Sequence, residues 1–189
     1  MRLKENQTAP AFKIEDINGQ LFDLNTPRKK PLLIAFFRYA SCPLCNLRVH
    51  ELIKNHAYLH DKIEILLIFQ SPKEKIEQYV GKQDIPYKVL PNPSKTLYHL
   101  YGVENSWLGF AKAWTVKIKQ VFIAVLQNRY LPGSVEGEIH RIPADFVVDT
   151  NNTILKTFYG KDIGDHLPLK ELDAILDREN RENNVILGS

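Results

Sequence analysis

Two apolar runs separated by a helical pattern restrict the fold of this chain more than any other feature. Residues 31–37 (PLLIAFF) and 63–69 (IEILLIF) are almost continuously apolar, as strands are when both faces of their sheet are buried. Between the runs, leucines at positions 44, 47, 52 and 59 form an approximate helical stripe. A strand, a crossover helix and a second parallel strand make a βαβ unit, so the sequence predicts a partly parallel, buried sheet.

Other patterns add strands and helices around this unit. Asn18-Gly19 lies between apolar segments and predicts an N-terminal β-hairpin, because both residues tolerate positive φ. Residues 146–158 predict a second hairpin near the end of the sheet, and residues 87–90 a short strand. Three further helices are expected, one starting at Ser71 as its N-cap, one over about 92–102 and one over about 168–178.

The order of these elements predicts an α/β fold with a mixed central sheet flanked by helices. The chain has 189 residues and is 44% hydrophobic, which suits one compact domain with a sizeable core. We expect that domain to span residues 1–178. Residues 179–189 are mostly polar and predict a frayed C-terminal tail.

Residues 103–129 form a distinctive insertion before the second hairpin. Large apolar residues recur there at three- and four-residue steps, with lysines between them: Trp107, Phe110, Trp114, Ile118, Val121 and Val125. This pattern predicts an amphipathic helix or a broken pair of helices. Packing of the apolar face onto the core is the favoured interpretation, and a homodimer formed through this helix is the alternative.

Composition excludes several classes of function. The chain has 25 basic and 22 acidic residues, a balance too even to indicate a nucleic-acid or membrane-surface partner. Its start lacks the apolar stretch of a signal peptide, and no segment has the ~20 apolar residues of a membrane span. Two cysteines are too few for a secreted disulfide framework. We therefore expect a soluble, cytoplasmic protein.

Both cysteines stand in one motif, Cys-Pro-Leu-Cys at residues 42–45, between the first buried strand and the predicted helix. Pro43 suits the first turn of a helix, where its missing N–H is no loss. Unpaired backbone N–H groups and the helix dipole favour anions at that end, so a thiol there becomes a thiolate nucleophile at neutral pH. A Cys-x-x-Cys beside a βαβ pattern is typical of redox chemistry.

Zinc binding is the main competing interpretation of the cysteines. Cys42 and Cys45, with His56 and His60, give the spacing C-x2-C-x10-H-x3-H, close to that of a zinc finger. If residues 43–60 form one helix, however, His56 lies ~16 Å or more along the axis from Cys45. The four groups could not then share one ion. We therefore predict no metal site, and no other cofactor is indicated.

The motifs and their order resemble the AhpC/TSA family (alkyl hydroperoxide reductase/thiol-specific antioxidant), in particular its peroxiredoxin-like branch with a CPxC pair. The resemblance rests on residues 9–12 (APAF), 36–45 (FFRYASCPLC), 92–103 and 139–149. It extends over roughly residues 7–177 and implies a thioredoxin-like fold and an antioxidant or redox-homeostatic oxidoreductase.

The chain departs from this family at the reaction centre. A typical peroxiredoxin has Pro-x-x-x-Thr-x-x-Cys and a later arginine near the sulfur. Laid on this sequence, the reactive Cys falls on Cys45, the Thr on Cys42, the Pro on Arg38, and the later Arg near Pro143. An Ile-Pro dipeptide ahead of a strand instead resembles thioredoxins, in which that proline is cis and faces the motif. These departures favour dithiol–disulfide exchange.

Four site residues follow from the motif and the resemblance. Cys42 is the candidate nucleophile, expected to be the more exposed thiol, and Cys45 the resolving thiol; the roles swap if the peroxiredoxin alignment governs. Arg38 either lowers the thiol pKa or orients a peroxide oxygen, or it pairs with a carboxylate. Pro143 is the expected cis-proline. The substrate would be a peroxide or a disulfide, with a thioredoxin-like or glutathione-like dithiol as the external reductant. The alternatives are a disulfide reductase without peroxidase activity and a non-enzymatic interaction module.

Overall fold

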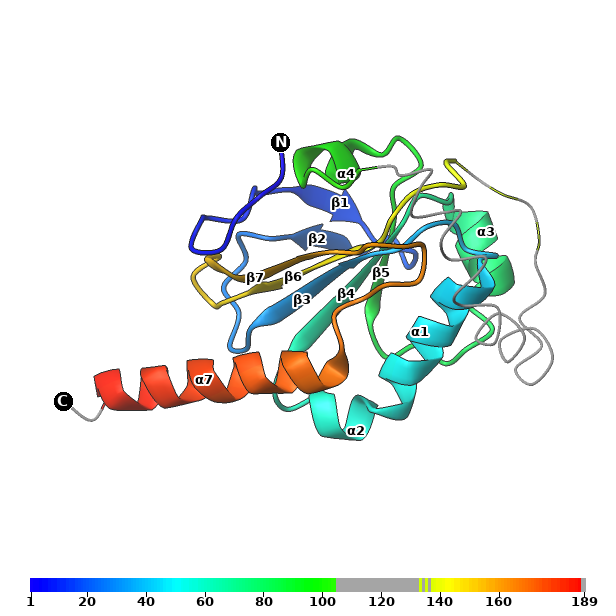
Figure 1. Ribbon diagram of the computed structural model, residues 1–189. Helices are drawn as coiled ribbons and strands as arrows, with labels where there is room; N and C mark the ends of the chain where they lie inside the picture. Colours follow the sequence, from blue (N-terminus) through cyan, green and yellow to red (C-terminus); the bar gives the residue numbers. More distant parts are fainter. Residues whose placement is uncertain (105–132, 134, 136, 188–189) are drawn as a thin grey trace.

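A five-stranded mixed sheet forms the centre of the protein (Figure 1). The computed structural model describes residues 1–104, 133, 135 and 137–187. The strand order is β5-β4-β3-β6-β7. β3 pairs in parallel with β4, which pairs in parallel with β5, whereas β6 is antiparallel to both β3 and β7. The strands span Leu32–Phe36 (β3), Glu64–Phe69 (β4), Lys88–Pro91 (β5), Ala144–Val148 (β6) and Ile154–Tyr159 (β7).

Both apolar runs are confirmed as central strands. Every residue of β3 is buried, and its side chains alternate between two hydrophobic clusters on opposite faces of the sheet. Leu33 and Ala35 face the cluster that includes residues of the helices α1 (Pro43–Lys54), α3 (Lys73–Tyr79) and α7 (Leu169–Leu187). Leu32 and Ile34 face the N-terminal hairpin and α4 (Thr96–Leu100). Figure 1 shows these two layers on either side of the sheet. Burial on both faces explains why the sequence shows no alternation there.

The predicted N-terminal hairpin is also confirmed. β1 (Lys13–Glu15) pairs antiparallel with β2 (Leu21–Asp23). Gly19 takes a φ of 77°, and the Asp16 carboxylate accepts hydrogen bonds from the backbone N–H groups of Asn18 and Gln20. Local turn chemistry therefore determines this hairpin.

The helix predicted over 43–60 is divided in two. α1 (Pro43–Lys54) ends at Asn55, whose ψ of 10° leaves the helical region, and α2 (His56–Leu59) follows as a single turn. The Asn55 amide donates to the carbonyl of Glu51 at 2.8 Å, an alternative hydrogen bond of the kind that ends helices.

The prediction of Ser71 as an N-cap is wrong. α3 (Lys73–Tyr79) is preceded by Pro72, and no side chain caps it. The Ser71 hydroxyl instead accepts a hydrogen bond from the backbone N–H of Ala40 at 2.8 Å. The helix expected over 92–102 is the shorter α4 (Thr96–Leu100).

The last helix is longer than predicted. α7 spans Leu169–Leu187, so residues 179–187 continue the helix where a frayed tail was expected (Figure 1). The polar composition that suggested a tail is equally compatible with a helix, because Glu and Arg are good helix formers.

The predicted helical insertion at 103–129 lies outside the described residues, apart from Val103 and Glu104. Among the helices that are described, none has the length and apolar character needed to cross a bilayer.

Tyr98 provides a test of the packing beside the motif. It is fully buried on α4, and its hydroxyl lies 2.7 Å from the carbonyl of Phe37 and 3.0 Å from that of Ile68. We predict that Tyr98→Phe lowers the free energy of unfolding by about 1–3 kcal/mol, because the buried carbonyl of Phe37 loses the hydroxyl donor. Chemical denaturation measures this loss. The exposed Tyr58→Phe is the control, with an expected change within about 0.5 kcal/mol; equal losses would contradict the assigned role.

Candidate active site

The Cys-Pro-Leu-Cys motif lies where β3 passes into α1. Cys42 is the residue before the helix, and Pro43 occupies the first turn as predicted. Both cysteines are free thiols, and their side chains approach within 3.2 Å of each other. The expectation that Cys42 is the more exposed thiol is wrong, because Cys42 is 1% and Cys45 2% exposed. They belong to the core cluster beneath α1.

Arg38 brings a cation to this pair. Its Nη1 donates a hydrogen bond to Cys42 Sγ at 3.2 Å, and its Nη2 donates to the carbonyl of Ile139. The guanidinium also lies 4.9 Å from the centre of the Tyr39 ring, within the range of a cation–π interaction. Arg38 is itself almost completely buried. The cation predicted to be near the motif therefore contacts the sulfur directly, and it links Cys42 to the segment that precedes Pro143.

The surroundings favour a thiolate at Cys42. Burial opposes ionisation of this thiol, but the hydrogen bond from Cys45, the Arg38 charge and the backbone N–H groups of Cys45 and Leu44 outweigh it and lower its pKa to about 6. A cysteine with this pKa is mostly ionised at neutral pH and is nucleophilic.

Cys45 has the opposite character. Burial raises its pKa well above the ordinary value, and the hydrogen bond to Cys42 and the charge on Cys42 raise it further. Cys45 therefore stays a thiol while Cys42 is a thiolate, and it donates to the neighbouring sulfur. The pair therefore holds a nucleophile, the Cys42 thiolate, and a protonated second thiol, Cys45, which are the two components of dithiol–disulfide exchange.

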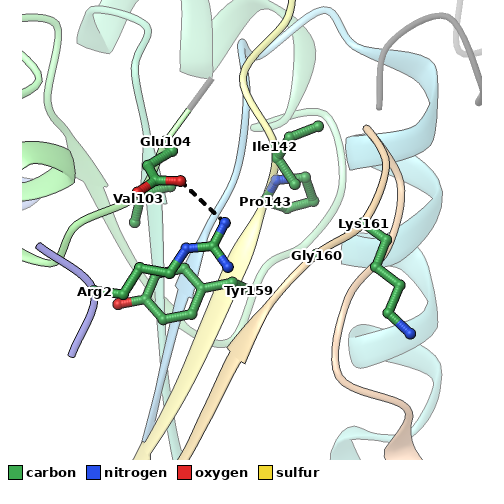
Figure 2. A pocket seen from close by; sticks show the side chains of 8 residues that line it. All are labelled: Arg2, Val103, Glu104, Ile142, Pro143, Tyr159, Gly160 and Lys161. Carbon is green, nitrogen blue, oxygen red and sulfur yellow. Dashed lines mark hydrogen bonds and ion pairs between the residues drawn. The ribbon is translucent and has the colours of Figure 1, made fainter. Parts of the chain in front are cut away.

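Pro143 starts the approach to β6 but differs from the prediction. No cis peptide bond occurs among the described residues, so the expectation of a cis-proline is wrong. Pro143 lies in the wall of a cavity of about 470 Å3 that neither cysteine lines. Figure 2 shows it among the other lining side chains. Its lining residues are Arg2, Val103, Glu104, Ile142, Pro143, Tyr159, Gly160 and Lys161.

The histidines of the zinc hypothesis lie apart from the cysteines. His56 is in α2 and packs against the rings of Tyr87 and His60 at 5.3 and 5.4 Å. His60 Nε2 lies 3.1 Å from the carboxylate of Asp61. Across the part of the chain that the structure describes, no three metal-ligating side chains form a cluster.

Sequence reasoning missed a buried ion pair on the same face of the sheet. His166 Nδ1 lies 3.0 Å from the Asp145 carboxylate, which also accepts the backbone N–H of Leu167 at 2.6 Å. Burial opposes the Asp145 charge, yet the His166 charge and hydrogen bond hold the pKa of that carboxyl below its usual value. The pair fastens residues 166–167 to β6. A single aspartate in the apolar strand 144–148 was the available signal.

The sequence analysis also missed the polar side chains that hold the turn before α1. Asn46 Nδ2 donates to the carbonyls of Ala40 and Cys42 at 2.7 and 3.0 Å, and Ser71 holds Ala40 from the other side. Asn46 is 3% exposed. The sequence places an asparagine directly after the motif, but it reveals neither the burial of the amide nor its main-chain partners.

Comparison with solved structures identifies the fold. Enterococcus faecalis AhpC superposes with a TM-score of 0.68 at 14% identity, covering 97% of this chain and 96% of that one. A reduced 2-Cys peroxiredoxin from Plasmodium vivax gives 0.67 at 16% identity, with coverages of 95% and 83%. The thioredoxin domain of a thiol-disulfide oxidoreductase from Bacteroides vulgatus gives 0.55 at 17% identity, with coverages of 86% and 94%. At these identities the likeness shows the predicted thioredoxin-like fold.

The chain belongs to the AhpC/TSA family, whose family model matches residues 6–157. No curated protein sequence matches it. Family membership and the peroxiredoxin and oxidoreductase neighbours support a thiol oxidoreductase.

The contact between Arg38 and Cys42 generates a titration prediction. In the reduced protein, thiolate absorbance in the ultraviolet should rise with pH through a midpoint at about 6, the pKa of Cys42. Arg38→Gln should move that midpoint upward, because the lost cation stabilises only the ionised form. Arg28→Gln, which removes a part-buried arginine bound to the carbonyl of Leu24, should leave it unchanged. A wild-type midpoint near the ordinary cysteine value of about 8.5 would contradict the prediction.

Proposed function

We propose that this protein is a thiol-disulfide oxidoreductase that cycles Cys42 and Cys45 between dithiol and disulfide to reduce peroxides or disulfides. One observation carries the proposal: Arg38 Nη1 lies 3.2 Å from Cys42 Sγ, inside a core where a charge needs a counter-charge. The opposite directions of the two cysteine pKa values support the assignment of Cys42 as nucleophile and Cys45 as resolving thiol.

With a disulfide substrate, the Cys42 thiolate attacks one sulfur and forms a mixed disulfide. The S–S bond of the substrate breaks, and its other sulfur leaves as a thiolate that takes up a proton. Cys45 then loses its proton and attacks Cys42 Sγ, which releases the second substrate thiol. The protein is oxidised by two electrons to the Cys42–Cys45 disulfide, and the substrate is reduced by two.

With a peroxide substrate, the same thiolate attacks an oxygen. The O–O bond breaks, Cys42 becomes a sulfenic acid, and water or an alcohol leaves. Attack by Cys45 expels water and gives the same intramolecular disulfide. In either case an external thiol reductant, a thioredoxin-like dithiol or two equivalents of a glutathione-like thiol, returns the pair to its reduced form and is itself oxidised to a disulfide.

Where the typical peroxiredoxin motif has its threonine, this chain has Cys42, and this difference favours disulfides over peroxides as substrates. In the peroxiredoxin alignment Cys45 takes the place of the reactive cysteine and Cys42 that of the threonine. A thiol thus replaces the threonine hydroxyl there, and it lies 3.2 Å from Cys45. The second candidate is therefore a thioredoxin-type disulfide reductase with no peroxidase activity. Arg38 supplies the cation for both, because a guanidinium stabilises a thiolate whatever the thiolate attacks.

A stoichiometric reaction followed by mass spectrometry separates the candidates. Reduced protein mixed with one equivalent of hydrogen peroxide should lose two hydrogens as the intramolecular disulfide forms. A small-molecule disulfide should produce the same loss. Reaction with the disulfide alone would leave only the reductase candidate, and reaction with neither would exclude both.

Single cysteine variants assign the roles. Cys45→Ser should accumulate a mixed disulfide on Cys42 when treated with a small-molecule disulfide, because nothing resolves it. Cys42→Ser should lose the reaction, because the remaining thiol has a raised pKa. Peptide mapping locates the adduct. A sulfenic acid trapped at Cys45 in Cys42→Ser would reverse the assignment and support the peroxiredoxin alignment.

A further inference from the structure

The turn that carries Cys42 is held by a side chain with no redox chemistry of its own. Asn46 lies one helical turn after Cys42 and donates twice to the carbonyl of Cys42, through its backbone N–H at 3.0 Å and through Nδ2 at 3.0 Å. The second proton of Nδ2 reaches the carbonyl of Ala40 at 2.7 Å. The backbone on both sides of Ser41 is thereby fixed by one amide group.

The orientation of this amide follows from its partners. Two carbonyl oxygens can be satisfied only by N–H groups, so Nδ2 must face the turn. Oδ1 then faces Gln83, whose Nε2 donates to it at 3.0 Å. Asn46 therefore uses both ends of its side chain, and Gln83, in the loop after α3, keeps it from rotating.

A second set of contacts holds the partner of Cys42 in place. At the end of β4, Ser71 accepts the backbone N–H of Ala40, and the neighbouring Gln70 pairs with the backbone of Glu138. Ile139, next to Glu138, provides the carbonyl that receives Arg38 Nη2. The turn that bears the sulfur is thus held by Ser71, and the segment that anchors the guanidinium is held by Gln70, the two residues that directly follow β4.

Position matters here because the contact between Arg38 and Cys42 is short and buried. The attraction between opposite charges falls with their separation, and it is screened less in the interior than in water. The N–H···S hydrogen bond is lost altogether when Sγ turns away. A shift of the 40–42 backbone therefore changes the reactivity of Cys42 without changing any reactive group.

We propose that Asn46 is a positioning residue for the Cys42–Cys45 reaction: by binding the carbonyls of Ala40 and Cys42 it holds Cys42 Sγ against Arg38. This inference rests on the proposed function for its biological meaning, but its physical content concerns the state of one thiol. Gln83 is the residue through which the Asn46 amide is oriented.

Thiolate titration of two matched asparagine variants tests the proposal. Asn46→Ala should move the Cys42 midpoint upward by about one pH unit, a tenfold change in the dissociation constant. Asn92→Ala is the control. Asn92 is 2% exposed, and it accepts the backbone N–H of Leu97 and donates to Thr96 in α4. That variant also loses buried hydrogen bonds, but it should leave the midpoint in place.

Two further variants keep the test decisive. Asn46→Asp has the shape of the native side chain, yet it lacks the two donors and brings a negative charge to the turn, so its midpoint should rise above that of Asn46→Ala. If Asn46→Ala does not fold, the part-buried Gln83→Ala replaces it, with a smaller upward shift expected. An unchanged midpoint in the folded Asn46 variants, or an equal shift in Asn92→Ala, would overturn the proposal.

The rate of mixed-disulfide formation separates this proposal from the proposed function. In the Cys45→Ser background, Asn46→Ala should slow the reaction at neutral pH and recover part of the rate at higher pH, where Cys42 ionises without help. A shifted midpoint in a protein that reacts with no disulfide or peroxide supports the positioning role and refutes the oxidoreductase. Wild-type reaction with an unshifted Asn46→Ala midpoint refutes the positioning role alone.

Discussion

The contact between a buried guanidinium and a buried sulfur is the interaction on which the rest of this site depends. Arg38 is 2% exposed, and a cation in such a place is costly unless an anion accompanies it. Cys42 provides that anion, so each charge lowers the energetic cost of burying the other.

The same surroundings divide two chemically identical residues into different roles. Cys42 receives the cation, the helix N–H groups and the proton of its neighbour, whereas Cys45 receives a negative charge beside it. The asymmetry comes from a spacing of three residues at a helix start, because the first-turn backbone N–H groups of Leu44 and Cys45 donate to the sulfur of Cys42. Two thiols elsewhere on a helix would not be distinguished in this way.

The sheet and the position of the cysteines were predictable because they depend on local patterns. The runs at 31–37 and 63–69 are apolar enough to be buried strands in any context, and the Cys-Pro-Leu-Cys motif follows the first of them directly. The Pro143 geometry and the burial of Cys42 were not predictable, because both depend on contacts between distant segments. The importance of Asn46 was equally hidden, since its partners are main-chain carbonyls that sequence patterns do not reveal. The end of α7 was misjudged because polar residues are compatible with both a helix and a tail.

The two ends of the connection between α4 and β6 are hydrogen-bonded to each other. Arg141 donates to the carbonyl of Val103, and the backbone N–H of Ile142 donates to the carbonyl of Glu104 at 3.3 Å. These hydrogen bonds fix where the chain leaves the folded core, at residues 103–104, and where it returns, at residues 141–142. Doubling the length of a closed loop costs only about 0.6 kcal/mol. The length of the connection between Glu104 and Arg141 can therefore change at little cost, provided that Ile139 keeps its contact with Arg38 and Glu138 keeps its contacts with Gln70.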